Sequence, residues 1–570
     1  MKLILAEYIN SLKEDGELDK MIQDILRANG VEIFSRPERG RQYGVDIYAV
    51  GKDFTDDDKK KVFLITVKQG DLDRQNWDGE VNSVRQSLDE IREVFVPNNL
   101  APQHKKLPIK IVVAYNGLIR QSLQQNWKGY TSQYTNFDFA LWEGDFLVEQ
   151  FQNNLLNESG FSNRLRSAVR KTIIHLENKD YQFSDFVQVL DMLEEEFKTT
   201  KYKKTKLRVL KEMRLLVAVV IKYCEEADNL LHAVKCSEKY LLRLWSMFTS
   251  GKTEKEFTKE VVEGFYLHRD TFEKYNAKFS FVVYVKDGLG RSVGDALGYG
   301  TVVYEQIGIW CETGLFYLQM CDFLTIAEGE NAQKTVTMYR ERATVLASEA
   351  INLVNNNQIF YTPRYDDHLI EIHMLLMLLY KLDLKQQARD ILFGLYKHIA
   401  EAYSFSRVFP TYRDLRTVAE LEADTSVRTC YDYNSSYLFT VLLEWSIVLD
   451  LPRLYDLLKG LKEGLLKEIT LLLWFPDKET ESKIFTENAN NDSGYALSGI
   501  DLSASMHEYK QLVEEEYEHN SFEKEFSFFK EGFWAIGLIA SRHFRTHIFP
   551  HYWRMFLRDD IHNAQSNDAF

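Results

Sequence analysis

Two apolar runs near the N-terminus restrict the fold more than any other feature of this chain. The runs GVDIYAV (44–50) and KVFLITVK (61–68) are short and rich in β-branched and aromatic residues, which predicts two strands of a buried sheet. Asp46 interrupts the first run and Lys68 closes the second. Because an isolated buried charge is unfavourable, charges at these two places indicate a functional pair.

Side-chain alternation along the second strand brings candidate site residues together. Alternate residues of a strand face the same side, so Lys68 and Thr66 point together, about 7 Å apart. If the first strand pairs beside the second, Asp46 projects into the same place. A carboxylate is a hard oxygen ligand for Mg²⁺, and a lysine beside it can stabilise charge that develops on a phosphate or orient the attacking water.

Strand and helix signals alternate through residues 1 to about 155. We expect an α/β domain there, with the order helix, three strands, helix, two strands, helix. The expected elements are helices at 16–30 and 81–95, strands at 31–35, 44–50, 61–68 and 108–117, and a final strand and helix within 136–156.

From about residue 160 onward, apolar residues recur at spacings of three and four, which predicts a large α-helical region over 160–570. A helix pair at 367–403 loosely resembles tetratricopeptide-type repeats, without a strict period, so a solenoid-like arrangement is one form this region can take. The Gly-rich segment 278–310 is β-prone, and we expect a hairpin insertion or a loop between helices.

Properties of the whole chain limit the class of protein. A chain of 570 residues is too long for one core, so we expect two to four domains. The net charge of −15 argues against a surface coated in basic charge but leaves room for a local basic groove. Five cysteines without zinc-ligand spacing fit a reducing compartment. Glu7 comes too early for a signal peptide, and no apolar run approaches the roughly 18–20 residues that span a bilayer, so we expect a soluble cytoplasmic protein with no membrane partner.

Taken together, the N-terminal motifs resemble the PD-(D/E)xK restriction-endonuclease-like superfamily in its Mrr-like branch. The matching segments are LDKMIQDIL before Gly30, GVDIYAV with KVFLITVKQG, IKIVVAYNG, and FALWEGDFLVEQF. The resemblance covers about the first 150 residues. It implies a restriction-endonuclease-like fold and hydrolysis of phosphodiester bonds with Mg²⁺, or Mn²⁺ in its place. DNA is the expected substrate, and RNA is left open.

The resemblance also implies roles for individual residues. Asp46 resembles the metal-binding aspartate, Lys68 the catalytic lysine, and Asp19 the acid on the family's first helix. Thr66 departs from the pattern, because the family usually has Glu, Asp or Gln there. A threonine hydroxyl is a neutral and weak Mg²⁺ ligand, so the departure puts metal binding in question.

Three interpretations of this departure remain open. The site can work with Asp46, Asp19 and the carbonyl of Val67 as metal ligands. An acid from another position, such as Glu38 or Glu80, can replace the missing carboxylate. Alternatively, the domain binds nucleic acid without cutting it.

Basic and polar residues beside the candidate site are expected to contact nucleic acid. Arg36, Arg39 and Arg41 precede Asp46, and arginine side chains grip phosphates as two-pronged donors. Gln69 follows Lys68 and is expected to contact the backbone of a bound strand.

The expected protein is therefore a nuclease domain (1–155) joined to a helical region (160–570) that senses a trigger or drives assembly. This layout resembles prokaryotic anti-phage defence effectors, which implies homo-oligomers or a partner defence protein. One alternative is a catalytically inactive subunit that binds nucleic acid or serves as a scaffold. Another is a ribonuclease that uses Arg542 and His547, whose Arg-x4-His spacing resembles the HEPN motif.

Overall fold

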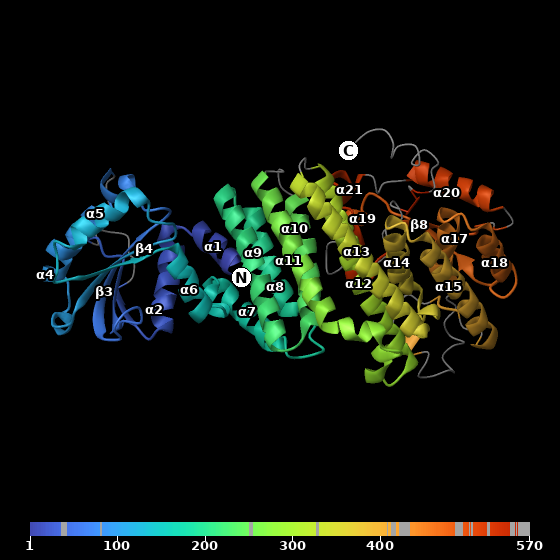
Figure 1. The fold of residues 1–570 in the computed structure, drawn as a ribbon, viewed down its shortest axis with the longest axis horizontal. Coiled ribbons are helices and arrows are strands. Elements are labelled where there is room, and N and C mark those ends of the chain that lie inside the picture. Colours follow the sequence, from blue (N-terminus) through green and yellow to red (C-terminus); the bar gives the residue numbers. More distant parts are fainter. Residues whose placement is uncertain are drawn as a thin grey trace. The chain divides into compact units, whose positions relative to one another are not determined.

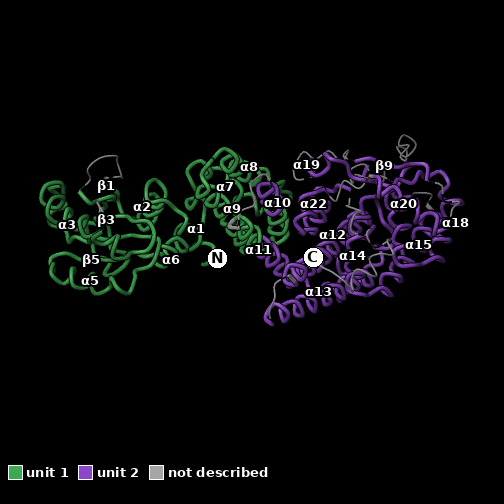
Figure 2. Tube along the Cα trace, turned by 90° about the horizontal axis from the view of Figure 1, so that it is seen from above, with its two compact units in different colours: residues 1–240, 250–264 green, residues 241–249, 265–570 purple. Residues whose placement is uncertain are grey.

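The computed structural model divides into two compact units, one of residues 1–240 and 250–264 and the other of residues 241–249 and 265–570 (Figure 2). Each unit is described by itself. The structure describes residues 1–35, 43–79, 83–249, 255–326, 330–406, 409–411, 418–420, 434–484, 494–500, 502, 505–520, 525–547, 553, 554 and 556.

A five-stranded sheet forms the centre of the N-terminal α/β domain (Figure 1). In spatial order its strands are β1 (Glu32–Ser35), β2 (Ile47–Lys52), β3 (Lys60–Lys68), β4 (Ile109–Tyr115) and β5 (Asp138–Trp142). The first three strands pair antiparallel, and β3, β4 and β5 pair parallel. The sheet is therefore mixed, and the two strands expected from the opening runs are neighbours in it.

Helices cover both faces of this sheet. Val62 and Leu64 of β3 belong to a core cluster with residues of α3 (Val84–Glu90) and α5 (Gln121–Thr131). On the other side lie α2 (Asp19–Ala28) and α6 (Gly144–Asn154), with α1 (Lys2–Ser11) packed on α6 (Figure 1). Phe63 and Ile65 alternate with the first pair and are fully buried, as expected of a strand covered on both faces.

The predicted helices and strands of this domain are present in the expected sequence, but two further helices, α1 before them and α5 between β4 and β5, were missed. The run that contains α1 was not recognised as helical, and α5 buries only Leu123 and Tyr130, so its apolar period is weak. Short helical segments complete the domain at Gln75–Gly79, Ile91–Phe95, Val96–Asn98, Pro102–His104 and Glu158–Gly160.

Long helices complete the first unit. They are α7 (Asn163–His175), α8 (Ser184–Thr199) and α9 (Lys203–Glu226), and the two units share α10 (Leu230–Thr249) and α11 (Lys255–Phe279). The buried Arg214 of α9 forms ion pairs with Glu7 of α1 and with Glu260 and Glu263 of α11. Because these carboxylates come from separate segments, the pairs fasten the N-terminal helix to the helices of the same unit.

The second unit is mostly helical, as predicted. Its helices are α12 (Ala296–Ile326), α13 (Glu330–Asn356), α14 (Leu369–Lys381), α15 (Lys385–Ser406), α17 (Leu438–Val448), α18 (Pro452–Glu463), α19 (Thr480–Ile484), α20 (Met506–Asn520), α21 (Ser527–Lys530) and α22 (Ala535–Phe544). Two small sheets pair β6 (Ser435–Ser436) with β7 (Thr470–Leu471), and β8 (Leu473–Phe475) with β9 (Tyr495–Leu497).

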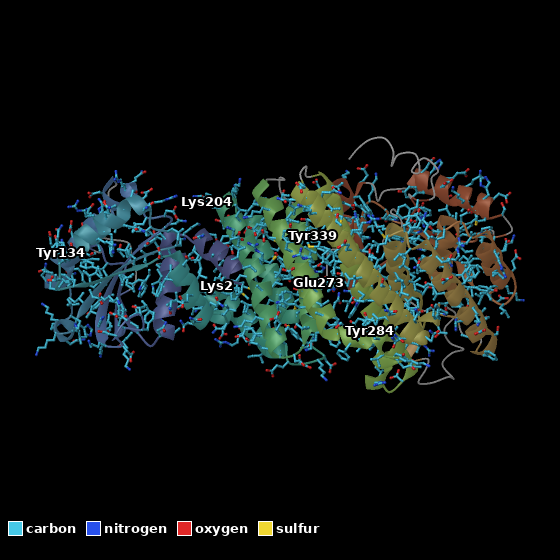
Figure 3. The ribbon with its side chains drawn as sticks, in the orientation of Figure 1. Lys2, Tyr134, Lys204, Glu273, Tyr284 and Tyr339 are labelled. Carbon is cyan, nitrogen blue, oxygen red and sulfur yellow. The ribbon has the colours of Figure 1, made fainter. Side chains whose placement is uncertain are left out.

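Side-chain contacts between α11 and α13 hold part of this unit together. Arg342 donates two hydrogen bonds to Glu273, at 2.9 and 2.7 Å, and Arg269 donates to the hydroxyl of Tyr339 at 2.8 Å (Figure 3). Two parallel hydrogen bonds between an arginine and a carboxylate fix the relative orientation of the two side chains as well as their contact.

Of the two alternatives for residues 278–310, the hairpin insertion is wrong, and the loop between helices holds only for the part that connects α11 to α12. The segment forms two short 3₁₀ turns, Ser280–Tyr284 and Gly288–Ser292, and then enters α12. Apolar residues lie on every side of α12, and most of its central part is buried. A helix surrounded by protein does not need an amphipathic pattern, so its β-branched residues gave a misleading signal. Among the described residues, no helix is both long and apolar enough to cross a membrane.

Candidate active site

Asp46 is held against the carboxyl end of β3. Its backbone N–H donates to the carbonyl of Ile65 at 2.9 Å, which continues the β2–β3 ladder by one residue. Its carboxylate accepts a hydrogen bond from the N–H of Val67 at 2.7 Å and another from the hydroxyl of Thr66 at 3.3 Å. The strand pairing therefore brings Asp46, Thr66 and Lys68 to one place, as the alternation of side chains predicted.

Glu14 is a second acid at this place, and the sequence analysis missed it. Its carboxylate lies 3.2 Å from the Lys68 ammonium, and its other oxygen accepts from the N–H of Gln69 at 3.2 Å. Glu14 begins the Glu14–Leu18 turn between α1 and α2, in which Asp15 and Gly16 leave helical geometry. The sequence offers no clear indication of this acid because its position depends on a turn, and a turn has no periodic pattern of apolar residues from which its geometry could be predicted.

Amide groups fix the end of α1 to the ends of the strands. The buried Asn116 donates to the carbonyls of Ile9 and Leu12 at 2.9 and 3.2 Å, and it accepts from the N–H of Gly70 at 2.7 Å. The side-chain amide of Gln69 also donates to the carbonyl of Leu12, at 3.1 Å. These bonds hold the residues that lead into Glu14, so the placement of that acid is built into the fold.

Burial sets the electrostatics of Asp46. Loss of hydration raises the pKa of its carboxyl, although the hydrogen bond from Val67 and the positive charge of Lys68 act in the opposite direction. The negative charge of Glu14 raises it further. The carboxylates of Asp46 and Glu14 carry more negative charge than the single ammonium of Lys68 can neutralise. A hard divalent cation would therefore relieve the cost of ionising Asp46.

Of the other predicted site residues, Val67 and Gln69 contact this group through their backbone N–H groups, and Asp19 lies on α2. Asp19 begins α2, and its carboxylate accepts from the N–H of Lys20 at 2.7 Å. Burial raises the pKa of Asp19, yet within the described part of the chain no hydrogen bond or ion pair joins it to Asp46 or Lys68. The roles of Asp19, of the Val67 carbonyl and of Gln69 in nucleic-acid binding stay predictions. Five further predicted residues, Arg36, Arg39, Arg41, Glu38 and Glu80, lie outside the described residues.

A separate acidic cluster lies at the opposite end of the strands. Asp53, Asp56 and Asp57 are close enough to hold a metal ion together. However, the ammonium groups of Lys61 and Lys110 lie 2.8 and 2.7 Å from the Asp53 carboxylate. Burial alone would raise the pKa of Asp53, but these lysine hydrogen bonds outweigh it and lower the pKa to about 2. The lysines already supply the positive charge at the buried Asp53, while Asp56 and Asp57 are exposed, so we interpret this cluster as an ion-pair network.

The Arg542 and His547 pair is not on one helix. The helix α22 ends at Phe544, and Arg545 has left-handed backbone geometry (φ 53°). Arg542 is buried and donates to Glu312 at 2.5 Å, while His547 stacks on Trp474 with ring centroids 4.7 Å apart. A continuous helix therefore does not carry the Arg-x4-His spacing, because the chain turns before it reaches His547.

Comparison of the chain with protein-family models, curated proteins and solved structures finds no match.

Proposed function

We propose that the N-terminal α/β domain is a metal-dependent nuclease of the restriction-endonuclease-like type that hydrolyses phosphodiester bonds in DNA. The observation that carries the proposal is the group of Asp46, Thr66, Lys68 and Glu14 at the carboxyl end of β3. Its donor set fits a hard divalent cation, since two carboxylates and a hydroxyl oxygen are available beside one lysine. Glu14 supplies the carboxylate that Thr66 lacks.

Each residue of this group has a distinct task in the proposal. Asp46 and Glu14 would hold Mg²⁺, which would polarise the phosphate and lower the pKa of a water molecule. The Val67 N–H and the Thr66 hydroxyl orient the Asp46 carboxylate. Lys68 stabilises the charge that develops on the phosphate during attack by water.

The ion pair between Lys68 and Glu14 is part of the resting site. Lys68 has one-fifth of its side chain exposed, and Glu14 has 38% exposed, so a phosphate can reach both groups. If Glu14 held the metal instead of pairing with Lys68, the Lys68 ammonium would be free to contact the phosphate. In this proposal the helical region carries the trigger or the partner contact, by analogy with defence effectors of similar layout.

Thr66 supports a second candidate, a domain that binds nucleic acid without cutting it. The two candidates differ in their need for metal. A supercoiled plasmid is incubated with the parent protein in Mg²⁺, Mn²⁺ or EDTA, beside Asp46→Asn and Lys68→Gln. The matched control is Asp58→Asn, which removes a carboxylate with 73% of its side chain exposed.

The nuclease proposal expects metal-dependent nicking by the parent and by Asp58→Asn, and none by the two site variants. Cleavage that survives Asp46→Asn contradicts it. If neither the parent nor any variant cuts, and the parent binds the plasmid equally in Mg²⁺ and EDTA, a domain that binds nucleic acid without cutting it is favoured.

A further inference from the structure

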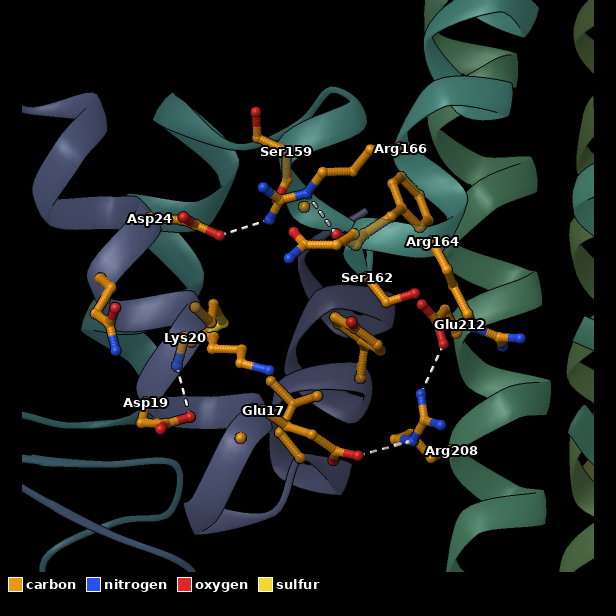
Figure 4. A pocket seen from close by; sticks show the side chains of 18 of the residues that line it. Glu17, Asp19, Lys20, Asp24, Ser159, Ser162, Arg164, Arg166, Arg208 and Glu212 are labelled. Carbon is orange, nitrogen blue, oxygen red and sulfur yellow. Dashed lines mark hydrogen bonds and ion pairs between the residues drawn. The ribbon is translucent and has the colours of Figure 1, made fainter. Parts of the chain in front are cut away.

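A pocket of about 450 Å³ lies within the first unit and is lined in part by Gly16 and Glu17 of the Glu14–Leu18 turn (Figure 4). Its walls come from α1, the Glu14–Leu18 turn, α2, the start of α7, and α8 and α9. This volume is within the usual range of small-molecule sites, roughly 300–1,000 Å³, and far exceeds what one inorganic anion needs. None of the residues assigned to the nuclease chemistry lines it except Asp19.

Basic side chains from three helices converge on this pocket. Arg164 and Arg166 come from α7, Arg208 from α9, and Lys20 and Arg27 from α2. The pocket is lined by as many carboxylates as basic groups: Glu17, Asp19, Asp24, Glu196 and Glu212. They orient the arginines: Arg166 lies 2.6 Å from Asp24, Arg208 lies 2.7 Å from Glu212, and Glu196 pairs with both Arg164 and Arg208. Arginines that are already oriented lose little freedom when they bind a phosphate as two-pronged donors.

Several donors at the pocket have spare capacity. The side chain of Lys20 extends into the space (Figure 4), and it forms no ion pair within the described part of the chain. Arg208 is 9% exposed, and its Nε has no hydrogen-bond acceptor among the described residues, although Glu17 lies 3.2 Å away. Arg208 also pairs with Glu196 and Glu212, so an anionic ligand would bind it by replacing one of these carboxylates and would supply the acceptor that Nε lacks.

The N-terminus of α7 adds backbone donors. Ser162 occupies the capping position, but its side chain makes no capping hydrogen bond. Ser162, Asn163 and Arg164 all line the pocket. The first N–H groups of a helix lack partners within the helix and attract anions. At this end of α7 the backbone of Ser162 already interacts with the Glu212 carboxylate, which an incoming phosphate would have to replace.

We propose that this pocket binds a nucleoside polyphosphate. Its phosphates would contact Lys20, Arg164, Arg208 and the start of α7. Phe161 contributes an apolar part of the wall against which a base can pack. The phosphates would take over arginine contacts that Glu17 and its neighbours now make.

The same turn connects this pocket with the candidate active site. Glu17 pairs with Arg208 at the pocket and accepts from the N–H of Lys13 at 2.9 Å. Glu14, three positions earlier, pairs with Lys68. Gly16 lies between them with φ of 80°, a geometry that other residues adopt with strain. A ligand that draws Arg208 away from Glu17 therefore shifts the turn that positions Glu14, and this regulatory part rests on the proposed nuclease function.

Binding is tested by isothermal titration calorimetry without DNA, using ATP and inorganic tripolyphosphate as probes. The parent is compared with Lys20→Ala and Arg164→Ala, both of which change exposed side chains. The matched control is Arg170→Ala, which removes another glutamate-paired arginine of α7 that does not line the pocket.

The proposal expects ATP to bind the parent and the control equally, and each pocket variant to bind it about tenfold more weakly. It also expects tripolyphosphate to bind more weakly than ATP, because it lacks a base. Absence of ATP binding, or equal ATP binding by all variants, overturns the proposal. Equal affinities for the two probes overturn the nucleoside part of it.

Coupling to the turn is tested by amide hydrogen exchange on Asp46→Asn, which removes nuclease activity from the readout. Bound ATP is expected to change exchange about severalfold at residues 14–18, where the N–H of Leu18 donates to the carbonyl of Lys13 at 2.9 Å. Unchanged exchange at saturating ATP overturns the coupling. Because neither measurement uses DNA, failure of the nuclease proposal leaves both results interpretable.

Discussion

The Asp46→Asn variant separates the stability of the domain from its function. The substitution keeps the size of the side chain and an oxygen that can accept from the Val67 N–H, but it removes the charge. Burial raises the folded-state pKa of Asp46 above its unfolded value. The folded state therefore holds a proton more tightly than the unfolded chain, and stability falls as the pH rises from the unfolded to the folded pKa. At neutral pH the parent bears this cost and the variant does not.

Metal reverses the order of stability. A cation that binds only the folded parent, at one hundred times its dissociation constant, adds about 2.7 kcal/mol. For a unit of this size that corresponds to an increase of about 5–10 °C in the melting temperature. Asp46→Asn, without the charge that binds the metal, should gain almost nothing. Because the parent must lose its proton to bind metal, its gain should fade as the pH drops through a folded pKa above that of an ordinary aspartate.

Calorimetry of the parent, Asp46→Asn and the control Asp58→Asn, in EDTA and in saturating Mn²⁺, measures both effects. We expect Asp46→Asn to be at least as stable as the parent in EDTA. We also expect it to lack the rise in melting temperature on Mn²⁺ addition, which Asp58→Asn retains. Equal Mn²⁺ shifts in all three proteins would refute it. So would a variant much less stable than the parent in EDTA.

Three further substitutions test other parts of the account. Glu14→Gln breaks a partly exposed ion pair with Lys68, so chemical denaturation should show a loss below about 1 kcal/mol while plasmid cleavage is lost; retained cleavage would remove Glu14 from the metal site. Asp53→Asn removes the charge shared by Lys61 and Lys110, but Lys61 keeps Asp138 at 2.9 Å, so the substitution should cost about 1.5–3 kcal/mol in urea unfolding. The folded pKa of Asp53 is about 2, so the stability that its ionised carboxylate contributes to the parent should be lost as the pH falls from about 4 towards 2. Asp53→Asn should not show this loss. Parallel curves of stability against pH for the two proteins would contradict the prediction. Thr66→Val removes one hydrogen bond to the neighbouring carboxylate, so the pH at which cleavage begins should rise, and an unchanged pH profile would show that the hydroxyl is not involved.

The sheet could be predicted because its strands carry local signals. Alternation along β3 placed Lys68 and Thr66 on one face, and the charged residue in the preceding run marked the strand that pairs with it. The structure bears this out, with Ile47 opposite Ile65 and Asp46 beside Thr66. The alternation of side chains and the isolated charges suffice to predict these two strands because both patterns depend on residues close together in the chain.

Features set by distant contacts could not be predicted in this way. Glu14 reaches Lys68 because Asn116 and Gln69 tie the end of α1 to two strand ends. The Asp19 assignment followed a helical pattern, but the acid that meets the lysine stands in the turn before that helix. The pocket combines α2 with α7, α8 and α9, so its walls come from segments more than one hundred residues apart.

The most direct test of the central claim is the position of Mn²⁺ in crystals of the protein, located by anomalous scattering. We predict a peak in contact with the carboxylates of Asp46 and Glu14, absent from crystals of Asp46→Asn. A peak only at the Asp53 cluster, or no peak in crystals soaked at a concentration that saturates Mn²⁺ binding in solution, would contradict a metal site at the end of β3.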